Sequence, residues 1–206
     1  RSLPVTAGVI NDHLSPFGSQ VYLIDIHPQK DAVTVLSDNL LKDPGFEDIS
    51  SIGVPSACYA RPGGDKGATY FLDTREHHDG NHSVRLMTPG EDKGITLRLF
   101  PFQVKAGSSY AISVWAKSDP EQRLPFLTNQ DSSRLYTMNH NPQYVEIELG
   151  VFGKARFVPD QQWRRYMTFV SIPSDTLESI RTNLILKMPG QGVAWIDDMK
   201  VYEEKP

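Results

Sequence analysis

Short runs of alternating apolar and polar residues, separated by turn-forming pairs, extend over most of this chain. The longest runs cover residues 109–118 and 193–202, and the pairs Gly107-Ser108 and Pro189-Gly190 precede them. A period of two is typical of strands with one buried face, and no stretch has the 3.6-residue period of an amphipathic helix. Fifteen Gly and 15 Pro residues supply the many turns that such a chain needs. The sequence therefore predicts an all-β fold.

Eight runs are predicted to be the main strands, a number that suits two antiparallel sheets packed face to face as a jelly-roll β-sandwich. They cover residues 68–73, 83–87, 94–100, 109–118, 144–151, 165–172, 182–187 and 193–202. A short helical turn is predicted at residues 174–180, where Leu177 and Ile180 would share one face. The polar passage 121–142 is predicted to be an irregular loop.

Charge and cysteine content argue against several classes of protein. The net charge is −4 and no basic cluster is present, which argues against nucleic acid or a membrane as a partner and favours a neutral or cationic ligand. No run approaches the ~20 apolar residues of a membrane-spanning helix. Cys58 is the only cysteine, so no internal disulfide can form. We expect its thiol to pack as a small hydrophobic group.

The most specific motifs lie at the two ends of the predicted sandwich. Residues 39–48 read NLLKDPGFED and residues 192–202 read GVAWIDDMKVY. Together they resemble the first and last strands of the galactose-binding-like jelly roll that occurs in many carbohydrate-binding modules. The resemblance covers residues 39–202 and implies a galactose-binding-domain-like sandwich. It does not name the sugar, because this fold hosts several functions.

The same resemblance implies a structural calcium ion. In modules of this type, the acid after the Phe of the first motif and the first acid of the closing Asp-Asp pair hold Ca²⁺, and the matching residues are Glu47 and Asp197. Carbonyl oxygens of residues 42–45 or 79–82 could complete the oxygen set that Ca²⁺ prefers. Such an ion would stabilise the fold and take no part in catalysis. The alternative is that both acids are hydrogen-bonded to turns.

Residues 1–38 do not continue the pattern of the sandwich. The strand-like runs at residues 2–5 and 20–26 are too short to bury a core of their own. The pattern R-x-x-P-V-x-x-G at the start resembles the last strands of the small β-domain that closes many barrel-type glycoside hydrolases. We therefore expect residues 1–38 to be terminal strands of a preceding domain plus a linker, and residues 39–206 to be the module. The alternative is a hairpin added to the edge of the sandwich.

Aromatic and polar side chains in loops and at strand ends are the candidate sugar contacts, because sugar rings stack on aromatic faces and polar groups bind hydroxyls. The selected residues are Arg85, Tyr136, Tyr144, Phe152 and Asn139. A wider set also contains Tyr59, Tyr70, Phe157, Asn81, Gln130 and Asn141. By contrast, Trp115, Trp163 and Trp195 lie in or beside predicted strands, so we expect their rings in the core.

No catalytic motif is present: the sequence lacks a nucleophile elbow, a phosphate-binding loop and a metalloprotease helix. Glu146 and Glu148 alternate on one predicted strand, and their spacing of ~7 Å lies within the range that glycosidases use. A solvated sheet face explains the same pattern more simply. The histidines at positions 77, 78 and 82 are predicted to be solvated loop residues rather than metal ligands.

The function predicted from the sequence is that of a non-catalytic carbohydrate-binding module of a secreted glycan-degrading enzyme, located outside the cell, in the periplasm or at the cell surface. The expected partners are a poly- or oligosaccharide and an upstream catalytic domain of the same polypeptide. A structural spacer without a ligand is one alternative, and a glycosidase catalytic domain is the other. Solvent-facing aromatic rings around Tyr136, Tyr144 and Phe152 would favour binding over a spacer role.

Overall fold

The computed structural model describes residues 5–6, 9–10, 37–50, 55–62, 68–88, 94–118, 144–189 and 192–204. The chain divides into two compact units, Arg1–Val33 and Thr34–Pro206. In the first unit, two short strands, β1 (Val5–Thr6) and β2 (Val9–Ile10), pair antiparallel. The run at residues 20–26 lies outside the described residues, and the assignment of residues 1–38 to a preceding domain stays a prediction.

The second unit contains twelve described strands. They are β3 (Cys58–Pro62), β4 (Thr69–Asp73), β5 (Ser83–Thr88), β6 (Ile95–Leu99), β7 (Phe102–Lys105), β8 (Ser109–Ser118), β9 (Val145–Leu149), β10 (Gly153–Phe157), β11 (Arg164–Ser171), β12 (Ser179–Thr182), β13 (Leu184–Met188) and β14 (Gly192–Glu203). Within the described part of the chain there is no helix, and thus none long and apolar enough to cross a membrane.

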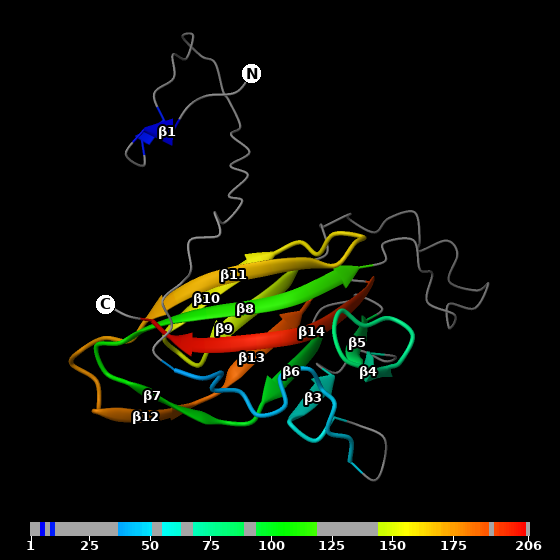
Figure 1. Ribbon diagram of the computed structural model, residues 1–206, viewed down its shortest axis with the longest axis horizontal. Helices are drawn as coiled ribbons and strands as arrows, with labels where there is room; N and C mark the ends of the chain where they lie inside the picture. The colour runs from blue at the N-terminus through cyan, green and yellow to red at the C-terminus, as the bar shows by residue number, and fades with distance from the viewer. Residues whose placement is uncertain are drawn as a thin grey trace. The chain divides into compact units, whose positions relative to one another are not determined.

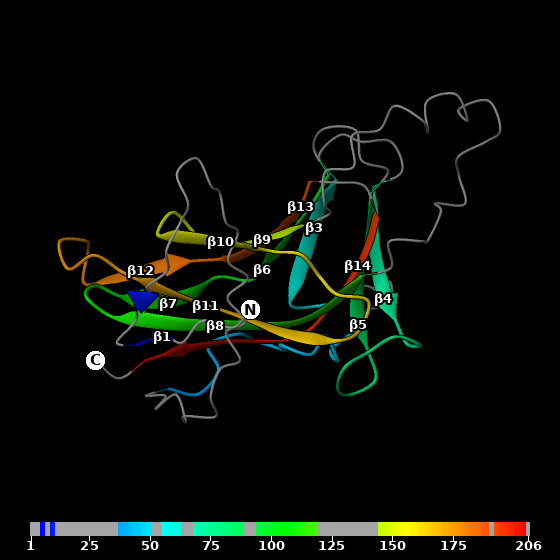
Figure 2. The same cartoon turned by 90° about the horizontal axis from the view of Figure 1, so that it is seen from above.

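The strands form two five-stranded antiparallel sheets, named here after their central strands. The β13 sheet has the order β10-β9-β13-β6-β3, and the β14 sheet has the order β11-β8-β14-β5-β4. Figures 1 and 2 show them as two layers, with β9, β10 and β13 in one and β8, β11 and β14 in the other. A separate two-stranded sheet pairs β12 with β7. This arrangement confirms the predicted antiparallel β-sandwich.

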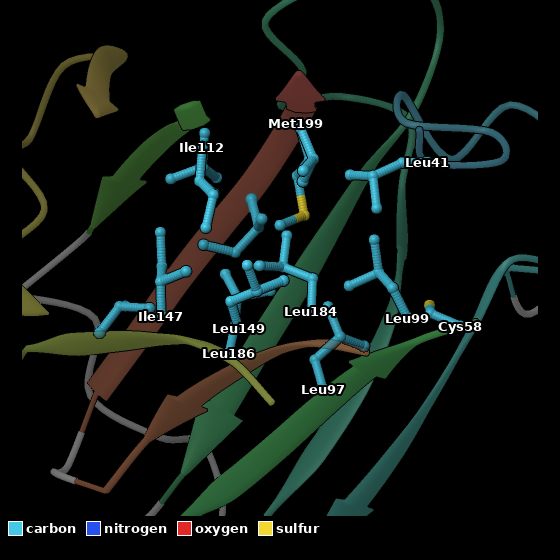
Figure 3. Packing of buried hydrophobic residues seen from close by; sticks show 14 of the residues in the cluster. Leu41, Cys58, Leu97, Leu99, Ile112, Ile147, Leu149, Leu184, Leu186 and Met199 are labelled. Carbon is cyan, nitrogen blue, oxygen red and sulfur yellow. The ribbon is translucent and has the colours of Figure 1, made fainter. Parts of the chain in front are cut away.

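The core lies between the two sheets and takes every second residue of most strands. On β6 and β13, the inward residues Leu97, Leu99, Leu184 and Leu186 are fully buried, and Figure 3 shows them pointing into one shared space. Each such side chain contributes about 1.5–3 kcal/mol to folding relative to an exposed one. Cys58 belongs to the same cluster, as predicted, and burial raises the pKa of its thiol to about 12.

All eight predicted main strands are present, but four short strands of the second unit were missed: β3, β7, β10 and β12. The predicted helical turn at residues 174–180 was wrong. The backbone N–H and the hydroxyl of Thr176 both donate to the carbonyl of Pro173, so this segment begins as a turn, and Ile180 in β12 pairs with Val104 in β7. Leu177 is exposed, so no second apolar residue supports a helical face there.

The first motif and the last strand lie side by side, as the sequence predicts. Strand β5 stays paired with β14 only as far as Ile196, which leaves one edge open on the C-terminal half of β14. The amide side chain of Asn39 fills this edge: its Nδ2 donates to the Met199 carbonyl at 3.0 Å, and its Oδ1 accepts the N–H of Val201 at 2.9 Å. One hydroxyl, Ser37 Oγ, extends the contact by accepting the N–H of Glu203 at 2.9 Å.

Candidate functional site

Asp197 lies at the centre of the molecule's most distinctive polar cluster. A register shift between Asp197 and Lys200 breaks the pairing of β14 with β8, and Asp198 adopts a left-handed backbone with φ 40°. The Asp197 carboxylate is fully buried and accepts three backbone N–H groups: those of His78 at 2.7 Å, Asp79 at 3.1 Å and Asp198 at 2.6 Å. Burial raises the pKa of Asp197, and these N–H donors only partly oppose that effect.

Glu47, from the opposite end of the module's sequence, holds the same β4–β5 loop. Its Oε1 accepts the backbone N–H groups of Asn81 at 2.8 Å and His82 at 3.0 Å, and its Oε2 lies 2.9 Å from His82 Nδ1. Burial raises the pKa of Glu47, but the N–H of Asn81 and the ring of His82 outweigh it, so this pKa lies below its ordinary value. Gly80 has φ 62°, and a Cβ there would displace the Glu47 carboxylate from its hydrogen bonds, so this position favours glycine.

The predicted calcium ligands therefore meet at one loop, but their carboxylate oxygens are already used. Each oxygen of Glu47 and Asp197 accepts at least one N–H from the surrounding chain. Hard carboxylate oxygens are the correct chemistry for Ca²⁺, yet six to eight oxygens must converge on the ion. Among the described residues, no group of three or more His, Cys, Asp or Glu side chains is placed to hold a metal. Glu47 and Asp197 thus supply only part of the oxygen set that Ca²⁺ needs, and calcium stays a prediction.

An alternating row of aromatic and cationic side chains crosses the outer face of the β14 sheet. Phe71, Arg85, Trp195 and Lys117 lie directly opposite one another on β4, β5, β14 and β8. The Arg85 guanidinium lies 5.1 Å from the ring centres of both Phe71 and Trp195, and Lys117 Nζ lies 5.1 Å from that of Trp195. Trp195 Nε1 also donates to Asp73 at 2.9 Å. These contacts leave Trp195 only 4% exposed.

The expectation that the tryptophan rings lie in a core is confirmed for Trp195, and Trp163 packs against the same buried cluster, whereas Trp115 is only half-buried. Trp195 is buried, but in a small outer cluster with Met87 and Val193. Trp115 is half-buried and stacks on the ring of His78, with centres 3.7 Å apart, while Trp163 meets the same imidazole edge-on at 6.0 Å. His78 is accordingly not a solvated loop residue, because the two indole rings cover it.

The outer face of the β13 sheet is polar and carries two short ion pairs. Arg156 on β10 donates to Glu146 on β9 at 2.6 Å, and Lys187 on β13 donates to Glu148 at 2.6 Å. The prediction of a solvated face here needs correction, because the Glu146 side chain is only 9% exposed. Burial raises the pKa of Glu146, but the hydrogen bonds from Arg156 and Glu148 and the nearby positive charges together outweigh it, and the net shift is downward.

Two tyrosines flank this face. Tyr59 on β3 is 37% exposed, and Tyr144, just before β9, lies with its ring centre 4.9 Å from the Arg156 guanidinium carbon. One further row crosses the face in register: Tyr59, Arg98, Ile185, Glu148 and Lys154 lie opposite one another on the five strands.

The selected sugar contacts do not form one group in the structure. Arg85 lies on the outer face of the β14 sheet, and Tyr144 lies beside the opposite outer face. Phe152, in the β9–β10 turn, is half-buried against the core. Tyr136 and Asn139 lie outside the described residues. Their role in binding stays a prediction.

The sequence analysis did not predict that Arg98, Lys154, Arg156 and Lys187 share the outer face of the β13 sheet. Each is the polar partner in an alternating strand pattern, so the available signal was their shared orientation, which becomes visible only once the strands are placed next to one another. Within the described part of the chain the first two form no salt bridge with an acid, whereas Arg156 pairs with Glu146 and Lys187 pairs with Glu148.

The fold is similar to that of solved carbohydrate-binding modules, although the sequence matches no family model and no curated protein. A structure described as CBM4 is 13% identical, with a TM-score of 0.52, and the match covers 80% of this chain and 99% of that one. The CBM22-1 xylan-binding domain of Paenibacillus barcinonensis Xyn10C is 14% identical, with a TM-score of 0.52, covering 82% and 96%. The Stig cyclase Fisc from Fischerella sp. TAU is 12% identical, with a TM-score of 0.53, covering 81% and 96%. At such identities the similarity establishes the fold alone.

Proposed function

We propose that this chain is a non-catalytic carbohydrate-binding module and that it binds a glycan on the outer face of the β13 sheet. The observation that carries the proposal is the composition of that face. It combines an exposed aromatic ring, Tyr59, with charged side chains that are held in place by two ion pairs. Ring stacking and preoriented polar groups are the two elements of sugar recognition. A structural neighbour described as a xylan-binding domain supports the same reading.

The opposite outer face is less suited to sugar stacking. Its central ring, Trp195, is covered on both sides by the cations of Arg85 and Lys117 and is almost fully buried. A sugar could reach this ring only by displacing those contacts. Each of them contributes about 0.5–1 kcal/mol at an exposed site and more when desolvated. The row on the β14 sheet therefore serves the stability of the fold.

On the β13 sheet, binding requires no chemical step. The carboxylates of Glu146 and Glu148 can accept hydrogen bonds from sugar hydroxyls, and Arg98 can donate to ring or hydroxyl oxygens. The pairing with Arg156 and Lys187 keeps the two acids from rotating away, which lowers the entropy cost of binding. Attached to a secreted glycan-degrading enzyme outside the cell or in the periplasm, such a module would raise the effective concentration of the catalytic domain near its polymer.

A role for Glu146 as the general acid of a glycosidase is disfavoured. A general acid must carry a proton near neutral pH, which requires a raised pKa. The hydrogen bonds and nearby cations instead outweigh burial and hold the pKa of Glu146 below its ordinary value. A spacer role without a ligand remains the second candidate, because all three tryptophan rings are engaged in contacts within the protein.

Affinity gel electrophoresis of the 206-residue chain on soluble polysaccharides tests the proposal. We expect retention on at least one glycan, and about tenfold weaker retention for Tyr59→Ala, because loss of an aromatic contact costs about 0.5–1.5 kcal/mol in addition to buried area. Phe169→Ala is the matched control, since Phe169 is an exposed ring on the outer face of the β14 sheet. No retention on any glycan, or equal losses for both variants, would overturn the proposal in favour of a spacer.

A further inference from the structure

The proposed glycan face carries more positive than negative charge, although the chain as a whole is acidic. Four cations, Arg98, Lys154, Arg156 and Lys187, project from it beside two acids, Glu146 and Glu148. For five of them a neighbour along the strand belongs to or packs against the core, and Lys154 lies opposite Glu148, so all six side chains face away from the core. The chain's net charge is −4, so this excess of cations is local to one surface.

The cations also lie nearer to solvent than the acids. In the Arg156–Glu146 pair the side chains are 59% and 9% exposed, and in the Lys187–Glu148 pair they are 40% and 16% exposed. Each acid is thus buried beneath its own partner. A molecule approaching the face meets guanidinium and ammonium groups first, and the paired acids contribute little negative field at the surface.

Two cations on this face form no salt bridge within the described part of the chain, although Lys154 lies close enough to Glu146 to help lower the pKa of that acid. Arg98 and Lys154 lie on the same cross-strand row, with β13 and β9 between them. Three strand spacings of ~4.8 Å place their backbones about 14 Å apart. Between them lies Ile185, which is buried, and the paired Glu148. The row therefore offers one positive group at each end of a short stretch able to hold a sugar.

We propose that the glycan bound on this face is anionic, carrying carboxylate or sulfate groups that pair with Arg98 and Lys154. The proposal rests on the proposed function and names its ligand class. A guanidinium group binds such anions with two parallel hydrogen bonds, which a neutral hydroxyl cannot match in strength. The expectation of a neutral or cationic ligand came from the net charge of the whole chain. Net charge averages over all faces, whereas a ligand experiences the potential of one.

The test compares glycans that differ only in charge, by affinity electrophoresis and calorimetry on the 206-residue chain. Polygalacturonate is paired with its fully methyl-esterified form, and dextran sulfate is paired with dextran. We expect at least tenfold tighter binding to one charged member than to its neutral partner, and the pair that responds identifies carboxylate or sulfate. Binding should weaken as NaCl rises from 0.1 M to 1 M, because the Debye length falls from about 10 Å to about 3 Å.

Three variants locate the effect. Arg98→Gln should weaken binding to the charged glycan about tenfold, as expected for a lost charge-assisted hydrogen bond. Lys154→Gln should weaken it about twofold to threefold, because an exposed charge contributes less. Arg75→Gln is the control, since this exposed cation lies in the β4–β5 loop. All three should melt like the unmodified chain.

The outcomes separate this inference from the function on which it rests. Equal or tighter binding to the neutral members overturns the anionic ligand but keeps the carbohydrate-binding function. No binding to any glycan overturns both. Equal binding to double-stranded DNA would reveal only unspecific attraction to polyanions and would also overturn the inference, as would an Arg75→Gln loss equal to that of Arg98→Gln.

Discussion

Replacing Asp197 by asparagine tests whether this buried acid holds the β4–β5 loop. Asn keeps the shape of the side chain, but one of its two terminal groups is an NH₂ donor. In the best orientation its oxygen keeps the N–H groups of His78 and Asp79, and the NH₂ group then faces the N–H of Asp198, now 2.6 Å from a carboxylate oxygen. Losing a hydrogen bond to a charged group costs about 1.5–3 kcal/mol.

A second effect opposes this loss. Because burial raises the pKa of Asp197, the charged acid carries a desolvation penalty that asparagine removes. We therefore expect a net destabilisation of about 2 kcal/mol at pH 7, near the lower end of that range. For a unit of this size the melting temperature should fall by about 4–8 °C.

Urea unfolding followed by circular dichroism measures this change, and Asp198→Asn is its matched control. Asp198 undergoes the same chemical substitution one residue away, where it pairs with Lys200 at 2.9 Å, and asparagine tolerates its left-handed backbone. The control should cost less than about 1 kcal/mol. If Asp197→Asn were no more destabilising than Asp198→Asn, Asp197 would not hold the loop as argued.

The pH dependence of the same variant has a defined sign. A raised pKa in the folded state means that the stabilising contribution of Asp197 is complete below its ordinary pKa of 3.8 and is lost as pH rises through the folded-state pKa. Asparagine does not titrate. The gap in unfolding free energy between the two proteins should therefore be largest in acid and narrow towards neutral pH, and a gap that widens would contradict this account.

Three further predictions concern other parts of the fold. Glu47→Gln should show the opposite pH trend: because the folded-state pKa of Glu47 is lowered, its contribution is present above the ordinary pKa of 4.5 and is lost as pH falls through the folded value, so the two proteins should converge in acid urea titrations. If calcium does bind beside Glu47 and Asp197, EDTA should lower the melting temperature of the dialysed protein and added CaCl₂ should restore it, whereas an unchanged temperature would remove calcium from the account. Trp195→Phe should lower the free energy of unfolding by about 1–3 kcal/mol, because it removes the hydrogen bond to Asp73 and part of the ring's packing contacts. The control Phe169→Ala removes an exposed ring and should change the same free energy by no more than about 0.5 kcal/mol.

The main strands could be predicted because burial of one face leaves a period of two in the sequence. In β8 the inward residues Tyr110, Ile112, Val114 and Ala116 are all buried, which makes the pattern easy to recognise. The edge strand β10 (Gly153–Phe157) was missed because small and charged residues alternate there, and the strand depends on its neighbour β9 rather than on its own apolar residues.

The polar sites were only partly predictable. The motifs at the two ends of the module were enough to predict that Glu47 and Asp197 lie close together. No sequence pattern, however, indicates which backbone N–H groups will donate to a carboxylate. The row from Phe71 to Lys117 depends on the register of four strands, and their order in the sheet does not follow their order in the chain. A residue such as Arg85 therefore looked like a loop-side ligand contact when its guanidinium in fact lies between two rings.

The antiparallel contact between residues 37–41 and the end of β14 determines how this protein would yield under tension. Ser37 and Glu203 meet at the same end of that contact, so a load pulling them apart acts across the bonds and opens them one at a time, as in a zipper. The bonds of Asn39 would break next, while Phe46 stays anchored in the core. Under force, residues 37–41 would thus separate from β14 first. The distance between the two pulled ends would increase before either sheet loses its strand pairing.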